Sequence, residues 1–191
     1  EKAKVGFEKG IEHMDRQLLG FELLPSQLQA INPLLVMVMI PVFSFGVYPG
    51  IQRLVPLTPL RKIGLGFFVT VVAFLIPAAV EHWIQQGQTP SIAWHLLAYV
   101  VLTSAEILVS ITCLEFSYTQ APKNLKSLVM ALFLMSVSIG NLFTAAVNFF
   151  IQNQDGSSKL SGAEYYLFFA GLMAVTALLF IPVAKRYPEK S

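Results

Sequence analysis

The stretch that decides the fold is LVMALFLMSVSIGNLFTAAVNFFI, residues 128–151, which contains no Asp, Glu, Lys or Arg. Three further runs without charge lie elsewhere in the chain, at residues 31–48, 63–80 and 165–184. A helix needs about 18 such residues in succession to cross the roughly 30 Å hydrocarbon core of a bilayer. Of the 191 residues, 13% are charged, whereas about 25% is usual in a soluble domain. The sequence therefore predicts a membrane protein.

Five apolar segments predict an all-α membrane protein with five transmembrane helices. The helices are expected at about residues 28–52, 60–82, 91–118, 126–151 and 164–184. Strands are disfavoured because an open sheet would expose backbone amides to lipid, and the alternating pattern of a membrane barrel is absent. The predicted division of the chain is a polar or interfacial segment with an outer loop at residues 1–27, the helical bundle at 28–184 and a tail at 185–191.

The connections between the helices alternate in charge. Basic residues gather in the connections after the first, third and fifth helices: Arg53, Arg61, Lys62, Lys123, Lys126, Lys185, Arg186 and Lys190. The other two connections carry few basic residues. Because Lys and Arg are retained on the cytoplasmic side, the pattern predicts a multi-pass protein of the cell (inner) membrane. Its first helix starts outside and its C-terminus is cytoplasmic.

Glu106 is the residue that points most directly to function. A rise of about 1.5 Å per residue from Ser91 places it roughly 20 Å into the third helix, near the middle of the bilayer. A carboxylate there costs at least about 2.5 kcal/mol unless it faces a partner or a wet cavity. It can bind an ammonium group or take up a proton, and both are carrier chemistry. The alternative is an anchor that only hydrogen bonds a neighbouring helix.

Polar residues accompany Glu106 along its helix. Regular helical spacing places three small polar side chains on its face: Thr103, Ser110 and Cys113. Glu115 falls on the opposite face, towards the cytoplasmic end and near Lys123. A structural or gating ion pair is expected for Glu115.

Two other positions combine an Asn with a helix-perturbing residue. Pro33 predicts a kink in the first helix, where Asn32 can hydrogen bond the freed carbonyl or a ligand. Gly140 predicts a close approach between helices, and Asn141 an interhelical hydrogen bond.

Catalysis finds little support in the sequence. His13, His82 and His95 are widely spaced and have no paired acid nearby, so neither a metal site nor a catalytic triad is expected. No glycine-rich phosphate loop is present. The net charge of +2 is not gathered on a basic face, so no nucleic-acid partner is expected. A non-enzyme without cofactor is predicted.

Longer motifs carry a family resemblance. The stretch EILVSITCLEFSYTQAP at residues 106–122, followed by KNLKS at 123–127 and by Gly140 and Asn141, closely resembles the proton-coupled oligopeptide transporter family of the major facilitator superfamily. LPSQLQAINP at residues 24–33 is similar to the start of that family's helix 8. The resemblance covers about residues 13–184. It implies that the five helices are helices 8 to 12 of a twelve-helix carrier, and that the chain is a fragment or an incomplete copy of it.

The resemblance also implies a function, the proton-coupled symport of di- and tripeptides. On this match Glu106 binds the amino group of the peptide, Asn32 contacts the peptide backbone and Ser110 lines the same cavity. Phe133 stands where the family usually has Trp in helix 11, and it would form part of a side-chain pocket.

Partners follow from the same match. The implied partners are the di- or tripeptide, the lipid bilayer, and the N-terminal half and helix 7 of the same carrier. Two alternatives stay open: a membrane scaffold or interaction subunit, and a facilitator carrier of another small solute such as nitrate or a drug. An anion carrier would want a basic residue near the midplane, and the five spans offer none.

Overall fold

The chain is seen in a computed structural model that describes residues 17–18, 21–22, 25–53, 56–151, 159–160 and 162–187. Two short strands, β1 (Gln17–Leu18) and β2 (Phe21–Glu22), form one antiparallel pair. Most of the predicted interfacial segment at residues 1–27, and the end of the predicted tail, lie outside the described residues.

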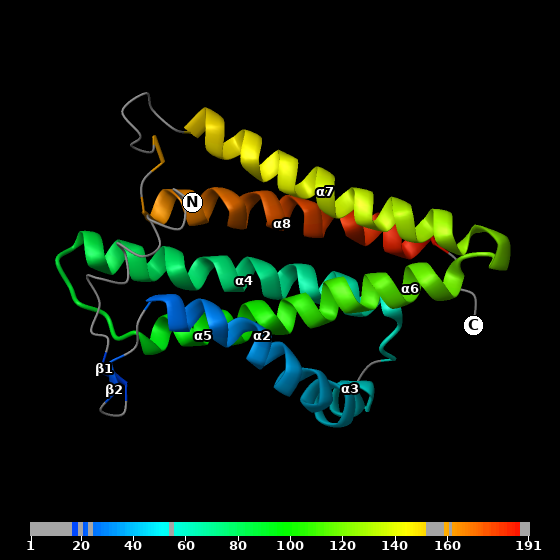
Figure 1. The fold of residues 1–191 in the computed structure, drawn as a ribbon, viewed down its shortest axis with the longest axis horizontal. Coiled ribbons are helices and arrows are strands. Elements are labelled where there is room, and N and C mark those ends of the chain that lie inside the picture. The colour runs from blue at the N-terminus through cyan, green and yellow to red at the C-terminus, as the bar shows by residue number, and fades with distance from the viewer. Residues whose placement is uncertain are drawn as a thin grey trace.

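Helices make up nearly all of the described structure (Figure 1). In chain order they are α2 (Pro25–Val42), the π-helix η1 (Phe43–Val47), α3 (Tyr48–Gln52), α4 (Pro59–Gln85), α5 (Ala93–Glu106), the π-helix η2 (Ile107–Ile111), α6 (Thr112–Gln120), the 3-10 helix η3 (Lys123–Leu125), α7 (Lys126–Ile151) and α8 (Ala163–Arg186). The π-helices are single wide turns inside otherwise continuous helices, α2–η1–α3 and α5–η2–α6. Five helices are therefore long and apolar enough to cross a membrane, and the predicted fold class is confirmed.

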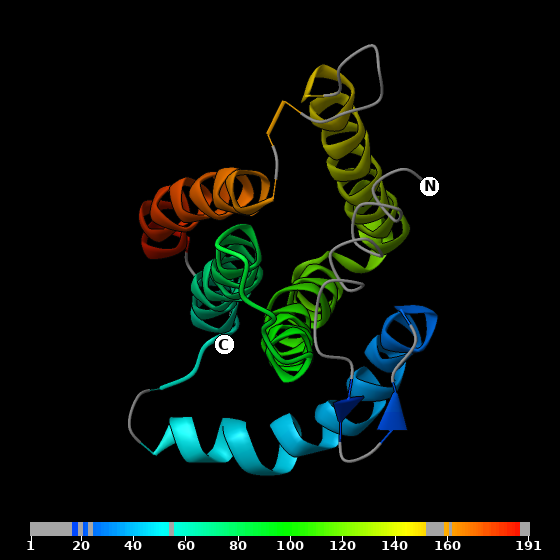
Figure 2. The same cartoon turned by 90° about the vertical axis from the view of Figure 1, so that its left-hand side faces the viewer.

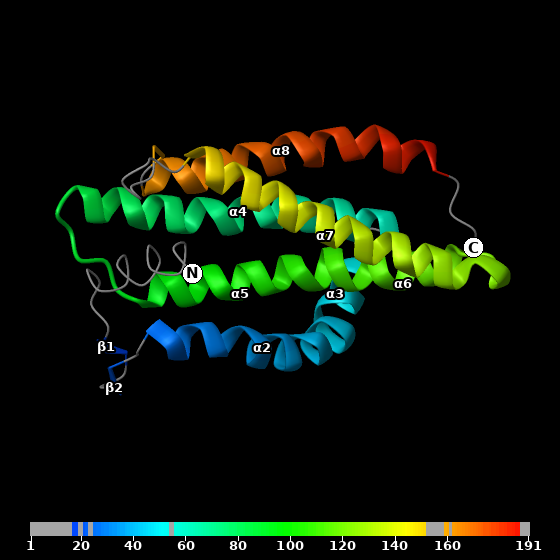
Figure 3. The same cartoon turned by 45° about the horizontal axis from the view of Figure 1, so that its top comes forward.

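Helix α4 is the centre of the bundle, with α8 on one side and α5 on the other (Figures 1 and 3). Phe67 and Phe74 of α4 meet Phe180 and Phe169 of α8, with ring centroids 5.0 Å and 6.1 Å apart. Alanines are buried along the same interface at positions 73, 170 and 177. Small side chains suit this contact because lipid tails are as apolar as the core, so close packing must hold membrane helices together.

A small buried cluster joins the two π-turns. Phe43 of η1 packs with Ile107 and Leu108 of η2, and all three side chains are at most 6% exposed. Val69 of α4 packs against the same cluster. A π-turn inserts one residue into a helix, and such turns occur often at functional sites. The first helix, α4 and the helix that carries Glu106 therefore meet at the two irregular turns.

Helix α7 lies apart from this core. It contacts α6 and η3 at its start, and Figure 2 shows it standing away from α4. None of its residues is buried by the described part of the chain. No described atom lies within 4 Å of the place that a Cβ would take at Gly140, and Asn141 is exposed. The predicted close approach at Gly140 is therefore not made to any helix described here, because α7 packs near its ends and leaves its middle open.

The far end of α7 is held to α8 by one side-chain hydrogen bond. The hydroxyl of Tyr165 donates to Oδ1 of Asn148 over 2.9 Å. We expect Tyr165→Phe to lower the free energy of unfolding by about 0.6 kcal/mol, the mean for such bonds between membrane helices. Thermal unfolding in detergent measures the change, with Tyr187→Phe as the control because Tyr187 lies beyond α8 and is exposed. Equal midpoints for the two variants would contradict the expectation.

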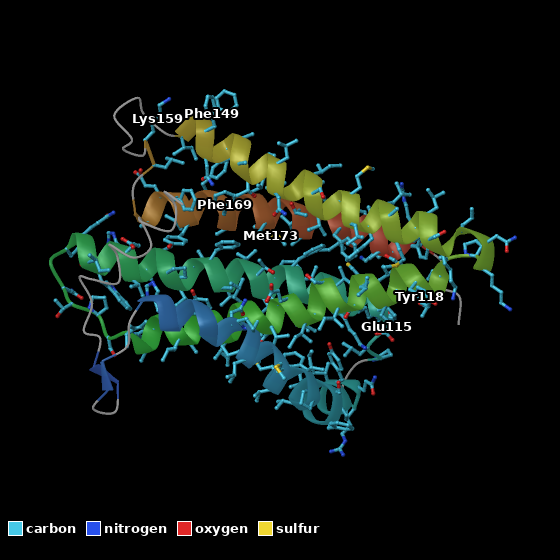
Figure 4. All side chains as sticks on the ribbon, in the orientation of Figure 1. Glu115, Tyr118, Phe149, Lys159, Phe169 and Met173 are labelled. Carbon is cyan, nitrogen blue, oxygen red and sulfur yellow. The ribbon has the colours of Figure 1, made fainter. Side chains whose placement is uncertain are left out.

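Basic side chains collect at one end of the bundle. The end of α3, the start of α4, the α6–α7 connection and the end of α8 lie at this end (Figure 1). Lys62 lies 4.2 Å from the ring centroid of Tyr48, and Lys126 lies 4.0 Å from that of Tyr118. Figure 4 shows Tyr118 at this end and Lys159 at the opposite end. The fold thus brings together the connections that the sequence marks as basic.

Candidate functional site

A pocket of about 420 Å³ lies between the first helix and the helix that carries Glu106. Its lining residues are Asn32, Pro33, Val36, Glu106, Ile107, Ser110 and Ile111. The volume is within the range of about 300–1,000 Å³ that is usual for small-molecule sites. Three of the four residues proposed from the sequence as substrate ligands, Asn32, Glu106 and Ser110, therefore meet in one cavity.

Among the described residues that line the pocket, Glu106 carries the one ionisable group. Glu106 is the last residue of α5 and is exposed. None of the described residues forms an ion pair or a hydrogen bond with its carboxylate. A carboxylate at this depth needs a counter-charge, a proton or water. The site is thus able to hold a cationic group.

Asn32 closes the pocket from the opposite side. Its Oδ1 accepts a hydrogen bond of 2.9 Å from the hydroxyl of Thr103, whose side chain is fully buried. This bond ties α2 to α5 across the bundle. Of the two roles that the sequence suggested for Asn32, bonding a freed carbonyl or a ligand, neither includes this partner.

The π-turn η2 changes which residues face the pocket. One inserted residue rotates everything beyond it by about 100° relative to a regular helix. Ser110 lies inside the turn and still lines the cavity, whereas Cys113 lies beyond it and does not. Ile111 lines the cavity, five residues after Glu106. The prediction that Cys113 shares the face of Glu106 assumed an unbroken α-helix, and Cys113 does not join Glu106 in the pocket lining.

Other candidates from the sequence lie outside the cavity. Phe133 is half-buried on α7 and does not line it. Glu115 and Lys123 form no ion pair within the described part of the chain. Lys123 begins η3 beyond a proline turn and is exposed. Figure 4 shows Glu115 towards the basic end of the bundle.

The apolar wall of the pocket was not foreseen. Four of its residues carry no polar group that would mark them: Pro33, Val36, Ile107 and Ile111. Val36 lies one turn after Asn32, so helical spacing could have found it. Ile111 could not be found in this way, because its orientation depends on the π-turn.

The described residues contain no group of three or more His, Cys, Asp or Glu that could hold a metal ion. The chemistry of the pocket is that of one carboxylate, one amide, one hydroxyl and an apolar wall. Such a site is suited to binding a solute.

The fold defines a multi-pass α-helical membrane protein. Comparison with known families then identifies the family of the chain. Residues 7–167 match the model described as "POT family". The chain therefore belongs to the POT family.

Relatives of known sequence agree with this placement. The chain is 32% identical over 134 residues to the peptide transporter PTR2 of Saccharomyces cerevisiae, a match of 63% of this chain and 22% of that protein. It is 33% identical over 164 residues to the peptide transporter PTR_A of Candidozyma auris, covering 76% of this chain and 28% of that protein. The chain thus spans about a quarter of the length of these curated relatives.

Solved structures show the same arrangement of helices. A crystal structure of an auto-inhibited POT family peptide transporter superposes with a TM-score of 0.84 at 34% identity, covering 100% of this chain and 38% of that one. The POT family transporter PepTSo superposes with a TM-score of 0.79 at 33% identity, covering 99% of this chain and 38% of that one.

Proposed function

We propose that this chain forms part of a proton-coupled transporter of di- and tripeptides, in which Glu106 binds the amino group of the peptide. One observation carries the proposal: the Glu106 carboxylate faces a pocket of about 420 Å³ together with Asn32 and Ser110, and has no partner among the described residues. The names of the relatives, which are peptide transporters, support the substrate class.

The pocket matches one of the two charged groups of a short peptide, its ammonium group. A free peptide carries an ammonium group and a carboxylate, so it needs an anion and a cation from its carrier. Among the described residues, the pocket lining includes an anion, Glu106, and no Lys or Arg. We assign the cation to the rest of a longer carrier, which also supplies the second bundle that alternating access requires.

Proton coupling follows from the same carboxylate. When the pocket is empty, a proton neutralises Glu106 at lower cost than a bare charge in hydrocarbon. When a peptide binds, its ammonium replaces that proton as the counter-charge. In symport the displaced proton passes to another acidic group of the longer carrier and leaves on the cytoplasmic side with the peptide, so that both move in the same direction.

The orientation in the membrane is part of the proposal. The basic end of the bundle faces the cytoplasm, because Lys and Arg resist transfer across the membrane. The end of α8 lies at this end, so the C-terminus is cytoplasmic.

The scaffold alternative assigns Glu106 to an interhelical hydrogen bond. In the structure that role belongs to a different pair, Asn32 and Thr103. A carrier of anions such as nitrate is disfavoured, since the charged group of the pocket lining is itself an anion.

Uptake by proteoliposomes tests the substrate class. We expect the complete transporter that contains this chain to concentrate a dipeptide when the outside is made acidic. An N-acetylated copy of the same dipeptide should compete at least about tenfold more weakly, because acetylation removes the positive charge that Glu106 binds and a charge-assisted bond contributes about 1.5–3 kcal/mol. Equal competition by the two compounds would refute the role of Glu106, and uptake that ignores the pH gradient would refute proton coupling.

A further inference from the structure

Thr103 makes a bond that is unlike those of three other threonines in the bundle. Thr70, Thr144 and Thr176 each donate to the backbone carbonyl four residues earlier in their own helix. The hydroxyl of Thr103 reaches instead across to α2 and donates to Oδ1 of Asn32 over 2.9 Å. A threonine on a helix readily satisfies its hydroxyl locally, so the bond across the bundle needs an explanation.

The two partners differ in their access to the pocket. The Thr103 side chain is fully buried and does not line the cavity, whereas Asn32 does. Thr103 therefore has no direct route to a bound solute, and any influence on binding must pass through Asn32. Thr103 lies about one turn before Glu106 on the same helix, so the bond also fixes the distance between α2 and the carboxylate.

The bond from Thr103 fixes which end of the Asn32 amide faces away from Thr103. The side chain of Asn ends in an acceptor oxygen and a donor NH₂ on one carbon. A hydroxyl has a single hydrogen, and here it is spent on Oδ1. The orientation of the amide is then set: its oxygen faces Thr103, and its Nδ2 donor is left for other partners. None of the described residues accepts a hydrogen bond from Nδ2.

We propose that Thr103 is a positioning residue, which holds the Asn32 amide so that Nδ2 is presented to a hydrogen-bond acceptor on the substrate. The proposal rests on the proposed function. The pocket then offers two complementary groups, a carboxylate for a cationic centre and an amide donor for an oxygen close to it. Without the hydroxyl, the amide is free to turn its oxygen towards the pocket, where it would repel the same acceptor.

Transport kinetics of the complete transporter test this role through a double-mutant cycle. Thr103→Val removes the hydroxyl and keeps the shape of the side chain. We expect it to raise the KM for a dipeptide about five- to tenfold, which is the effect of losing one well-oriented hydrogen bond, with kcat changed less than about twofold. Thr103→Ser keeps the hydroxyl and should remain close to wild type. In an Asn32→Ala background, Thr103→Val should have no further effect on KM.

Control variants separate this role from packing. Thr70→Val removes a half-buried hydroxyl that bonds within its own helix, and it should leave KM unchanged. Thr103→Ala also lacks the hydroxyl but adds no methyl group against Oδ1. It should therefore reproduce the rise in KM even if Thr103→Val fails to reach the membrane.

Three results would overturn the inference in a transporter that does carry peptides. They are an unchanged KM in both hydroxyl-free variants, a loss in Thr103→Ser as large as in Thr103→Val, and the same penalty from Thr103→Val with or without Asn32. A wild-type transporter that fails to carry peptides would refute the proposed function and this role with it. The wild-type assay therefore distinguishes the two failures.

Discussion

Replacing Glu106 by Gln is expected to abolish the concentrative uptake of a dipeptide by the complete transporter. Glutamine has nearly the same shape, so the pocket formed with Asn32 and Ser110 keeps its volume. The charge is lost, however, and the ammonium of the peptide is left without its counter-charge. Truncating one partner of a buried charge pair costs about 2–5 kcal/mol, so uptake at low peptide concentration should fall roughly 100-fold.

Under the proposed function, the same substitution also removes the group that takes up the proton. Glutamine cannot alternate between a protonated form and a form paired with an ammonium. Any transport that remains in Glu106→Gln should therefore be downhill and insensitive to an imposed pH gradient. Exchange of labelled for unlabelled peptide, measured without a gradient, distinguishes weak binding from lost coupling.

The matched control for this experiment is Glu164→Gln. Glu164 is exposed in the first turn of α8, away from the pocket, and its loss should leave uptake unchanged. Glu106→Asp keeps the charge but draws it back by one methylene, so it should keep part of the uptake. Near-wild-type uptake by Glu106→Gln would remove the proposed mechanism. Loss of both Glu106 variants from the membrane would favour the scaffold alternative.

Much of the fold could be predicted because the bilayer imposes a simple rule on composition. Four long runs without charge must lie in hydrocarbon, and the third span could be recognised despite Glu106 and Glu115 because it is equally apolar elsewhere. Glu106 could be identified because a charge at such depth is costly and therefore conspicuous. Ser110 followed from helical spacing, and Asn32 from the adjacent Pro33 and the family resemblance.

The predictions from the sequence that the structure did not support failed for local physical reasons. Nothing in the residues of η2, ILVSI, marks a π-turn, so the sequence did not show that Cys113 would lie outside the pocket lining. A glycine in a helix was also an ambiguous indication of helix packing, since it permits another helix to approach closely without requiring it. At Gly140 no described atom approaches, whereas at Gly66 another helix comes close. Sequence alone does not show which glycine faces a neighbour.

Replacing Gly66 by Ala is the second substitution expected to have a large effect, because α4 approaches η2 closely at Gly66. A Cβ added to Gly66 would lie 2.5 Å from Cγ2 of Val109 and 2.8 Å from Cβ of Leu108. It would also lie 3.2 Å from the backbone nitrogen of Val109. Two of these atoms belong to the backbone or are fixed directly to it, so a rotamer change cannot relieve the contact. Overpacking of this kind costs about 1–3 kcal/mol.

We expect Gly66→Ala to lower the thermal unfolding midpoint of the transporter in detergent and to raise its KM for peptide as well. The second effect arises because η2 must move away from α4, and η2 carries Ser110 and Ile111 of the pocket. Gly171→Ala is the control, since no described atom lies within 4 Å of a Cβ at that position on α8. It should lower neither stability nor affinity.

A Gly66→Ala protein with wild-type stability would show that η2 yields easily, and the pocket would then not depend on contact with α4 for its shape. A stable variant with a raised KM would show that the turn can move as a unit while the bundle stays folded. A loss of stability with an unchanged KM would separate the packing of α4 from the binding of peptide.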